Sequence, residues 1–138
     1  HKFEAGTPRI AEAFGWHAAV QWLDQHDMEE VHAHVSSLAR WTAKQMREIP
    51  GMRIYGRHDL ETTSGVVSFL HENIHAEDLA HLMDAGGFAV RTGHHCAQPL
   101  MEALGVSSTA RASFWIYNTM EEAEAFVNHL RGIVDRFS

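Results

Sequence analysis

This chain changes its hydrophobic period at Met52-Arg-Ile-Tyr55 and Gly65-Val-Val-Ser-Phe-Leu70, and these two runs decide the fold. Both are short, rich in β-branched or aromatic residues, and bounded by glycine or polar turn residues, a pattern typical of strands. The preceding residues, from Met28 to Ile49, repeat apolar side chains at steps of three and four, which predicts a helix that Pro50-Gly51 ends. The chain therefore combines long helices with a sheet.

The same criteria predict further strands and helices on both sides of these runs. Thr119 and Glu122 have the spacing of a capping box, which starts the last helix. The other predicted elements are a helix from Pro8 to about His26, a helix from Ala76 to Ala85, a strand from Phe88 to Arg91, a helix that begins near Pro99, and a strand from Ala110 to Tyr117. This order predicts an α/β fold, an α+β sandwich of two layers with a small, mostly antiparallel sheet covered by helices.

Composition limits the class of protein. The 138 residues, 45% of them hydrophobic, suffice for one domain over residues 1–138, in which residues 1–8 form a turn-rich arm. A net charge of -7 argues against nucleic acid or an anionic membrane as a partner. No apolar run reaches the roughly 18 residues of a membrane span, and the single cysteine fits a reducing compartment, so we expect a cytoplasmic protein. The chain begins at His1 without an initiator Met, which suggests a processed product or an excised piece.

A zinc-protease motif is the first candidate site. His71-Glu-Asn-Ile-His75 matches H-E-x-x-H, and His81 falls where a third zinc ligand is expected, with Glu72 as the general base. That chemistry needs a helix that presents His71 and His75 one turn apart. The strand pattern before His71 argues against such a helix, and Asp78 replaces the glycine of the motif. The alternative interpretation is a set of solvated histidines at a corner between a strand and a helix.

The second candidate is the segment from Arg91 to Pro99, which holds the only thiol of the chain, Cys96. It lies between a predicted strand and a predicted helix. A cation, imidazoles and a helix N-terminus nearby all favour a thiolate, so we expect Cys96 to be nucleophilic. A lone cysteine is otherwise most often a small buried hydrophobe. The polar residues around Cys96 favour the reactive interpretation.

Arg111 and the pair Gly6-Thr7 are two further candidates. Arg111 lies among small residues on a predicted strand, which leaves room for a ligand whose carboxylate its fork could bind. A surface ion pair is the alternative explanation for this arginine. Gly6 and Thr7 offer an exposed amide and a hydroxyl that could hold an anion.

Three stretches of the chain resemble one family in the family's own order. They are Phe3-Glu-Ala-Gly-Thr-Pro8, the run from Gly87 to Pro99, and Ala110-Arg-Ala-Ser113 with the following Tyr117-Asn-Thr119. They resemble the C-terminal small domain of the cysteine desulfurases that use pyridoxal 5'-phosphate (PLP), members of fold-type I and of the class V aminotransferase superfamily. The similarity is to the group II, Suf-like branch, which includes selenocysteine lyases.

This resemblance implies a role for each candidate residue. Cys96 would be the catalytic thiolate that takes sulfur from L-cysteine and leaves L-alanine, keeping a persulfide for iron-sulfur cluster assembly. Arg111 would clamp the substrate carboxylate, and Arg91 would help to organise the cleft. Gly6 and Thr7 would contact the cofactor phosphate in the neighbouring subunit of a homodimer, and His94 and His95 would border the nucleophile. The sulfur would pass to an acceptor protein of the Suf type.

The cofactor lysine of this family belongs to a large N-terminal domain that these residues do not include. The lysines of the chain are Lys2, in the arm, and Lys44, in a helix whose apolar stripe faces elsewhere. We therefore expect PLP in the full-length parent and not on this chain, and we expect the chain alone to be inactive. Two alternatives stay open: selenocysteine lyase activity in the parent, and a module that serves only in folding or protein docking.

Overall fold

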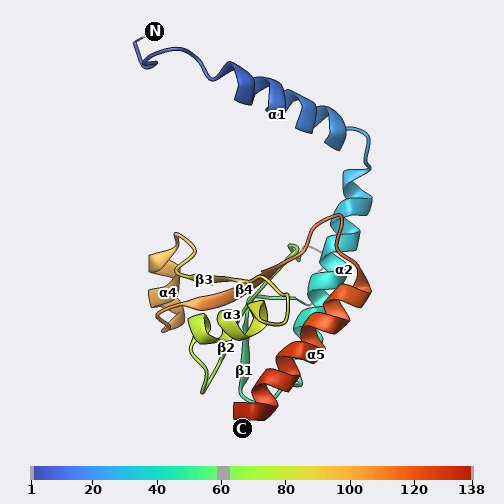
Figure 1. Ribbon diagram of the computed structural model, residues 1–138, viewed down its shortest axis with the longest axis vertical. Coiled ribbons are helices and arrows are strands. Elements are labelled where there is room, and N and C mark those ends of the chain that lie inside the picture. Colours follow the sequence, from blue (N-terminus) through green and yellow to red (C-terminus); the bar gives the residue numbers. More distant parts are fainter. Residues whose placement is uncertain (1, 59–62, 138) are drawn as a thin grey trace.

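The structure, a computed structural model, describes residues 2–58 and 63–137. Helices precede, interrupt and follow a small sheet (Figure 1). The elements within the described residues are α1 (Ile10–Leu23), α2 (Met28–Arg47), β1 (Met52–Tyr55), β2 (Val66–His71), α3 (Ala76–Asp84), β3 (Arg91–Gly93), α4 (Gln98–Leu104), β4 (Thr109–Ser113) and α5 (Met120–Phe137).

The four strands form one sheet in the order β1-β2-β4-β3, and every neighbouring pair is antiparallel. The central pair, β2 and β4, comes from distant parts of the chain, with Ser68 opposite Arg111. The short β3 adds to the outer side of β4 and sets Arg91 opposite Arg111. The predicted α/β fold with a small antiparallel sheet is confirmed.

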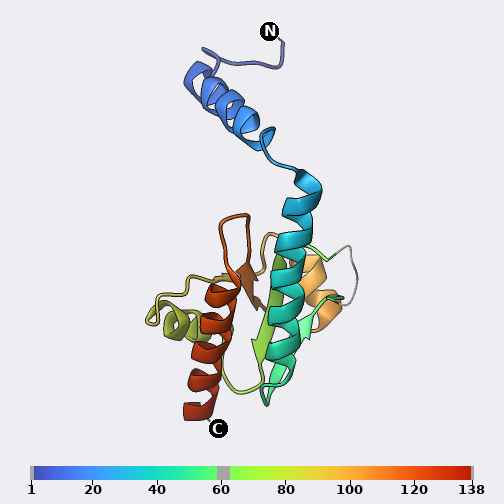
Figure 2. The same ribbon diagram turned by 90° about the vertical axis from the view of Figure 1, so that its right-hand side faces the viewer.

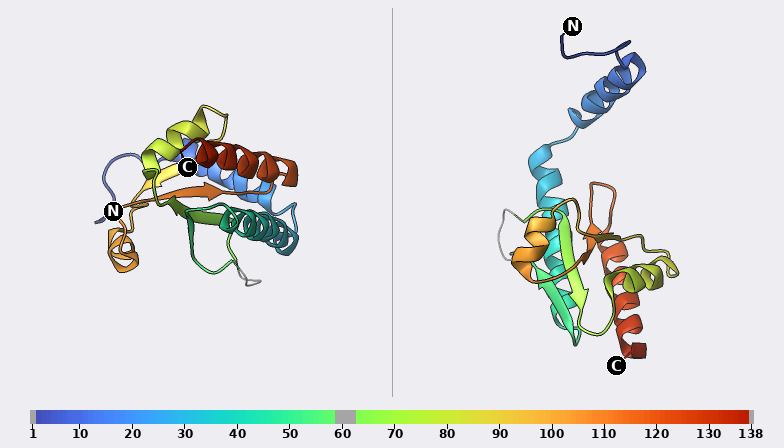
Figure 3. Two further views of the ribbon diagram at one scale, coloured as in Figure 1. Left: turned by 90° about the horizontal axis from the view of Figure 1, so that it is seen from below. Right: turned by 90° about the vertical axis from the view of Figure 1, so that its left-hand side faces the viewer.

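Burial alternates along the strands and distinguishes the two faces of the sheet. On β2, Val67 and Phe69 are fully buried, while Ser68 between them and Val66 before them are only half-buried. Helices α2, α3 and α5 supply the other side of the core that these buried side chains enter. The opposite face, which carries Ser68 and Arg111, is here called the open face. Viewed from below, α4 lies on the other side of β4 from α3 and α5 (Figure 3).

The core joins the buried face of the sheet to the three helices. Phe69 of β2 meets Phe126 of α5 edge to face, with ring centroids 6.3 Å apart, a favourable arrangement of two aromatic rings. The α2 and α5 helices lie side by side over the sheet (Figure 2). The largest fully buried apolar side chains are Phe69, Leu38, Met46, Leu79, Met83, Leu130, Val67, Val127 and Val134.

The predicted capping box at the start of α5 is confirmed. Glu122 N–H donates to the hydroxyl of Thr119 at 3.2 Å, and Thr119 N–H donates to a carboxylate oxygen of Glu122 at 3.0 Å. The amide of Asn118 also donates to that carboxylate at 3.1 Å. The hydrogen bond from the Thr119 backbone, followed by that from Asn118, lowers the pKa of Glu122.

Two predicted strand boundaries are wrong. β3 begins at Arg91 and not at Phe88, because Phe88 turns inward and packs edge to face on Phe126, with ring centroids 5.8 Å apart. β4 ends at Ser113 and not at Tyr117. The chain turns there because the side-chain oxygen of Asn118 accepts the N–H of Trp115 at 2.8 Å, which closes a local loop in place of the sheet ladder.

Helix α1 projects away from the rest of the molecule (Figure 1). It forms within the predicted bounds of Pro8 and His26, but none of its residues is buried. Phe14 is 72% exposed and Trp16 is 74% exposed, so these two large apolar side chains are not covered by any described residue. None of the described helices combines the length and apolar character that a membrane crossing requires.

Leu130→Ala should destabilise the chain by about 2–5 kcal/mol, because Leu130 is 0% exposed and its removal leaves a cavity between α5 and the sheet. The matched control is Leu100→Ala on α4, where the side chain is 53% exposed and the expected change is within about 0.5 kcal/mol. Urea unfolding followed by circular dichroism gives both values. Equal effects of the two variants would contradict the assignment of the core.

Candidate functional site

The sheet register places two arginines side by side on the open face. Arg91 of β3 lies directly opposite Arg111 of β4, and Arg111 lies opposite Ser68 of β2. Residues directly opposite one another on antiparallel strands point to the same face of the sheet. Within the described residues, no carboxylate forms an ion pair with either guanidinium. Two adjacent positive charges therefore lie on the open face without an acidic partner in the part of the chain that the structure describes.

Arg111 is the more confined of the two arginines. It is half-buried, and its Nε atom is shielded from solvent without a hydrogen-bond partner among the described residues. A buried N–H left unpaired is costly, whereas a carboxylate could accept two parallel hydrogen bonds from this fork. Among the described residues, no carboxylate forms the surface ion pair considered for Arg111. The geometry suits an anionic ligand that brings its own carboxylate.

Cys96 lies close to this pair of arginines. Its side chain is exposed, so it does not belong to the core. The Nη2 atom of Arg91 lies 4.0 Å from Sγ of Cys96, within reach of a hydrogen bond to sulfur. Ala97 N–H donates to the carbonyl of His94 at 2.9 Å, which closes a tight turn around the cysteine. The turn leads into α4, where Pro99 occupies the first turn as predicted.

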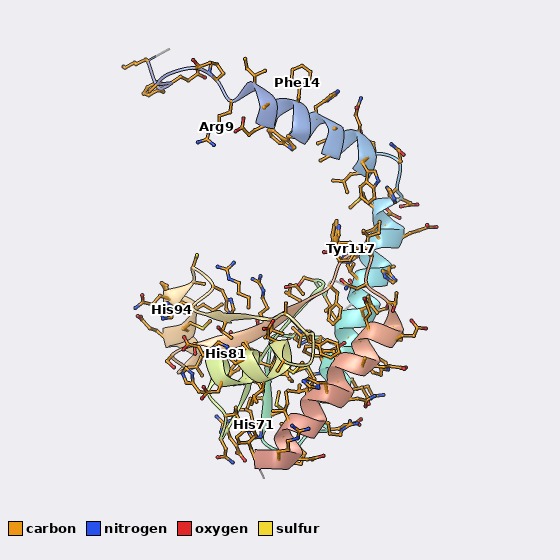
Figure 4. The ribbon with its side chains drawn as sticks, in the orientation of Figure 1. Arg9, Phe14, His71, His81, His94 and Tyr117 are labelled. Carbon is orange, nitrogen blue, oxygen red and sulfur yellow. The ribbon has the colours of Figure 1, made fainter. Side chains whose placement is uncertain are left out.

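His95 and His94 flank the cysteine differently. His94 is exposed and lies at the α4 side of the molecule (Figure 4). The Nε2 atom of His95 lies 3.1 Å from the carbonyl oxygen and 2.9 Å from the hydroxyl of Thr109. Since a carbonyl only accepts, Nε2 carries the proton and donates it to Thr109. Burial lowers the pKa of His95, and the charges of Arg111 and Arg91 add to that effect while the Thr109 carbonyl opposes it.

Thr109 is a site residue that the sequence analysis missed. It is 1% exposed although it shares the open face with Arg111, two residues along β4, because His95 hydrogen-bonds to it there. The period of two along the strand was the available signal, since it puts residues 109 and 111 on one face. The hydrogen bond of Thr109 to His95 could not be predicted, because the loop between the two residues sets their distance.

Gly6 and Thr7 are not brought to this site. They lie in the arm that precedes α1, exposed and at the far end of the projecting helix (Figure 1). Gly6 has a positive φ of 81° and no atom lies near the place of a Cβ. Any contact of these two residues with a site of the kind formed by Arg111 would involve another part of the protein or another copy of it.

The zinc-protease interpretation is wrong. His71 ends β2 and His75 precedes α3, so the two side chains do not share a helix face, and His81 lies on α3 (Figure 4). The Nδ1 atom of His71 accepts the N–H of Asn73 at 3.2 Å instead. Within residues 2–58 and 63–137, no group of three histidine, cysteine or acidic side chains could hold a metal ion.

Comparison with known proteins identifies the family. The family model for class-V aminotransferases matches residues 1–126. The chain belongs to the class-V aminotransferase family. Membership of this family implies, as a general property of the family, that PLP is the cofactor.

The relatives and structural neighbours of the chain include cysteine desulfurases. A probable cysteine desulfurase of Staphylococcus epidermidis is 45% identical over 137 residues, which cover 99% of this chain and 33% of the relative. The structure of cysteine desulfurase CsdA from Escherichia coli, an S-sulfonic acid form, superposes with a TM-score of 0.89 at 34% identity over 98% of this chain and 33% of that one. The apo enzyme from Thermococcus onnurineus gives 0.91 at 36% identity, over 97% of this chain and 33% of that one. The chain thus spans about a third of the length of the curated relatives it matches.

The residues present fit only part of a PLP site. Arg111 and Arg91 suit the carboxylate of an amino acid, but a PLP enzyme also needs a lysine that forms a Schiff base. Lys44 is exposed on α2, and Lys2 lies in the arm with its Nζ 5.4 Å from the centre of the Phe3 ring. Neither lysine is placed beside Arg111 to anchor the cofactor.

The lowered pKa of His95 predicts a pH dependence of stability. The unfolded chain takes up a proton near pH 6.5, whereas folded His95 takes it up only at lower pH. The contribution of His95 to stability is therefore present above about pH 6.5 and is lost as the pH falls toward the pKa of the folded state. We expect His95→Gln to reduce the loss of unfolding free energy between about pH 7.5 and 5.5, as measured by urea unfolding. The same loss in His95→Gln and in the unmodified chain would show that the imidazole is not shielded.

Proposed function

We propose that this chain supplies the substrate clamp and the sulfur-accepting thiol of a group II, Suf-like cysteine desulfurase. The observation that carries the proposal is the arrangement on the open face. Arg91 and Arg111 lie side by side without a carboxylate partner among the described residues, and Cys96 Sγ lies 4.0 Å from Arg91. The desulfurase names of the relatives agree with a cysteine-derived substrate.

Arg111 and Arg91 divide the binding of the substrate between them in this proposal. The guanidinium of the half-buried Arg111, whose Nε–H has no partner among the described residues, donates hydrogen bonds to the carboxylate of L-cysteine and so fixes one end of the substrate. Arg91 is exposed at the rim and interacts with the carboxylate side and with the thiol of Cys96. With its carboxylate on Arg111, the substrate can place its sulfur on the side of Arg91, where Cys96 Sγ lies 4.0 Å from Nη2 of that arginine.

The proposed chemistry transfers one sulfur atom. The Cys96 thiolate attacks the sulfur of L-cysteine, a new S–S bond forms, and the carbon–sulfur bond of the substrate breaks. The carbon keeps the electron pair of that bond and takes a proton, so the products are L-alanine and a persulfide on Cys96. PLP, when bound, supplies the electron sink that makes such a bond labile. The exposed position of Cys96 leaves the persulfide accessible to an acceptor.

In this proposal Gly6 and Thr7 act at the site of a neighbouring subunit and not at the site formed by Arg111. Both are exposed on an arm that projects beyond α1, so they can contact the cofactor phosphate in the neighbouring subunit of a homodimer. A hydroxyl and an amide free of side-chain cover are suited to an anion. We place the enzyme in the cytoplasm, where a Suf-type acceptor would receive the sulfur for iron-sulfur cluster assembly. Selenocysteine is the alternative substrate, since the same clamp and thiol would hold it.

The chain of residues 1–138, mixed with PLP and L-cysteine, should release no alanine and no sulfide above a blank without protein. The physical reason is that neither Lys2 nor Lys44 is placed to hold the cofactor beside Arg111. Amino-acid analysis for alanine gives the readout. Turnover by this chain alone would show that its own residues anchor PLP.

In an enzyme that joins this chain to the remaining length of its relatives, Arg111→Gln should lower kcat/KM for L-cysteine about 10- to 100-fold, mainly through KM. The loss corresponds to one charge-assisted hydrogen bond of about 1.5–3 kcal/mol. Arg53→Gln is the matched control, because Arg53 is an exposed arginine on the edge strand β1 of the same sheet. Steady-state alanine production measures both variants. An unchanged KM in Arg111→Gln, or an equal rise in Arg53→Gln, would refute the clamp.

A further inference from the structure

We propose that His95 is a positioning residue whose hydrogen bond to Thr109 holds the turn that carries Cys96. The inference rests on the proposed function for its catalytic meaning, since it concerns how the sulfur-accepting thiol is kept in place. It concerns a side chain to which the resemblance gives only a place beside the nucleophile. Three features of the described residues support it: the backbone of the turn, the anchor on β4, and the unpaired side of the imidazole ring.

The backbone of the turn is in an unfavourable conformation. His94 and Ala97 are joined by a hydrogen bond of 2.9 Å between the N–H of Ala97 and the carbonyl of His94. The two residues between them, His95 and Cys96, have φ values of 55° and 59°. Positive φ at both inner residues is the pattern of a type I′ turn, which glycine and asparagine favour. A histidine and a cysteine adopt it only where the surroundings hold them there.

The anchor that holds the turn is Thr109. Its backbone is fixed in β4, where it pairs with Gly93 of β3, and its side chain is 1% exposed. His95 Nε2 lies 2.9 Å from its hydroxyl and 3.1 Å from its carbonyl oxygen. The turn is thus tied to the strand that also carries Arg111, two residues further along. This tie fixes the distance between the thiol and the arginines.

The two ring nitrogens of His95 differ in their surroundings, and the difference indicates which of them matters. Nδ1 of His95 is shielded from solvent and has no hydrogen-bond partner among the described residues. A buried lone pair without a donor is unfavourable, and a phenylalanine of similar shape would avoid it. The Nε2–H donor to Thr109 is therefore the feature that an imidazole adds here. Since Nδ1 is covered, the ring is placed to position the turn and not to take a proton from a ligand.

The contact between Cys96 and Arg91 depends on this turn, because Arg91 lies on β3 and Cys96 lies in the turn that follows that strand. Arg91 starts β3 and is fixed by pairing with Arg111, whereas the backbone of Cys96 lies in the turn and outside the sheet. If the turn opens, Sγ leaves the position 4.0 Å from Arg91 Nη2. We expect the substrate clamp to survive such an opening, since Arg111 belongs to the sheet.

The first test is hydrogen exchange of the Ala97 amide, followed by NMR in the chain of residues 1–138. His95→Phe removes the donor and should speed exchange about tenfold, the loss of one hydrogen bond. His95→Gln restores an N–H donor at a similar reach, and its exchange should stay close to that of the unmodified chain. His94→Phe is the matched control on the neighbouring exposed residue. Unchanged exchange in His95→Phe, or equal acceleration in all three variants, would overturn the proposal.

A second measurement needs no substitution and covers the case in which His95→Phe does not fold. The 15N shifts of the His95 ring in the unmodified chain report which nitrogen carries the proton. The proposal requires the proton on Nε2, with the coupling of a hydrogen bond to Thr109. A proton on Nδ1 would contradict it.

The catalytic arm of the test uses the enzyme joined to the remaining length of its relatives. His95→Phe should lower kcat for L-cysteine while KM stays near its original value, and His95→Gln should recover most of kcat. A rise of KM with unchanged kcat would contradict a role in positioning the thiol. If Cys96→Ser left alanine production intact, the proposed function would fail, whereas the Ala97 exchange result would stand by itself.

Discussion

The one-sided burial of a four-stranded sheet is the constraint on which the rest of this structure depends. Helices α2, α3 and α5 bury the alternate residues of β2 and β4, with Phe69 among them. The intervening residues of the same strands then have to face outward, and Arg111 is one of them. On β4, a period of two thus puts Ala110 and Ala112 in the core and the polar residues Thr109, Arg111 and Ser113 on the other face.

The site combines side chains fixed on the sheet with a cysteine in a turn whose backbone is strained. Arg111 and Arg91 are fixed by the ladder between β3 and β4, while Cys96 occupies a turn with an unfavourable backbone. His95 connects the two by binding Thr109 on the strand. This division suits a thiol that has to meet a clamped substrate and afterwards present its sulfur outward. Helix α1, exposed along its length, extends in another direction with the arm that carries Thr7.

Particular residues show how far the sequence could predict this arrangement. Strand β1 and the capping box of Thr119 could be predicted because their signals are local. The motif with Cys96 could be recognised because its combination of residues is unusual. The ends of β3 and β4 were not, because Phe88 is drawn into the core and Asn118 closes a turn. The alignment of Arg91 with Arg111 depends on strand register, which the sequence does not state. The H-E-x-x-H pattern failed because the strand of Val67 and Phe69 reaches His71.

The central proposal is that the thiol of Cys96, beside the paired arginines, receives the sulfur. The direct measurement is peptide mass spectrometry of an enzyme containing this chain, quenched with an alkylating agent soon after L-cysteine is added. We predict that the peptide with Cys96 gains the mass of one sulfur atom, in step with the first turnover of alanine. Alanine formation with no added sulfur on that peptide would contradict the account.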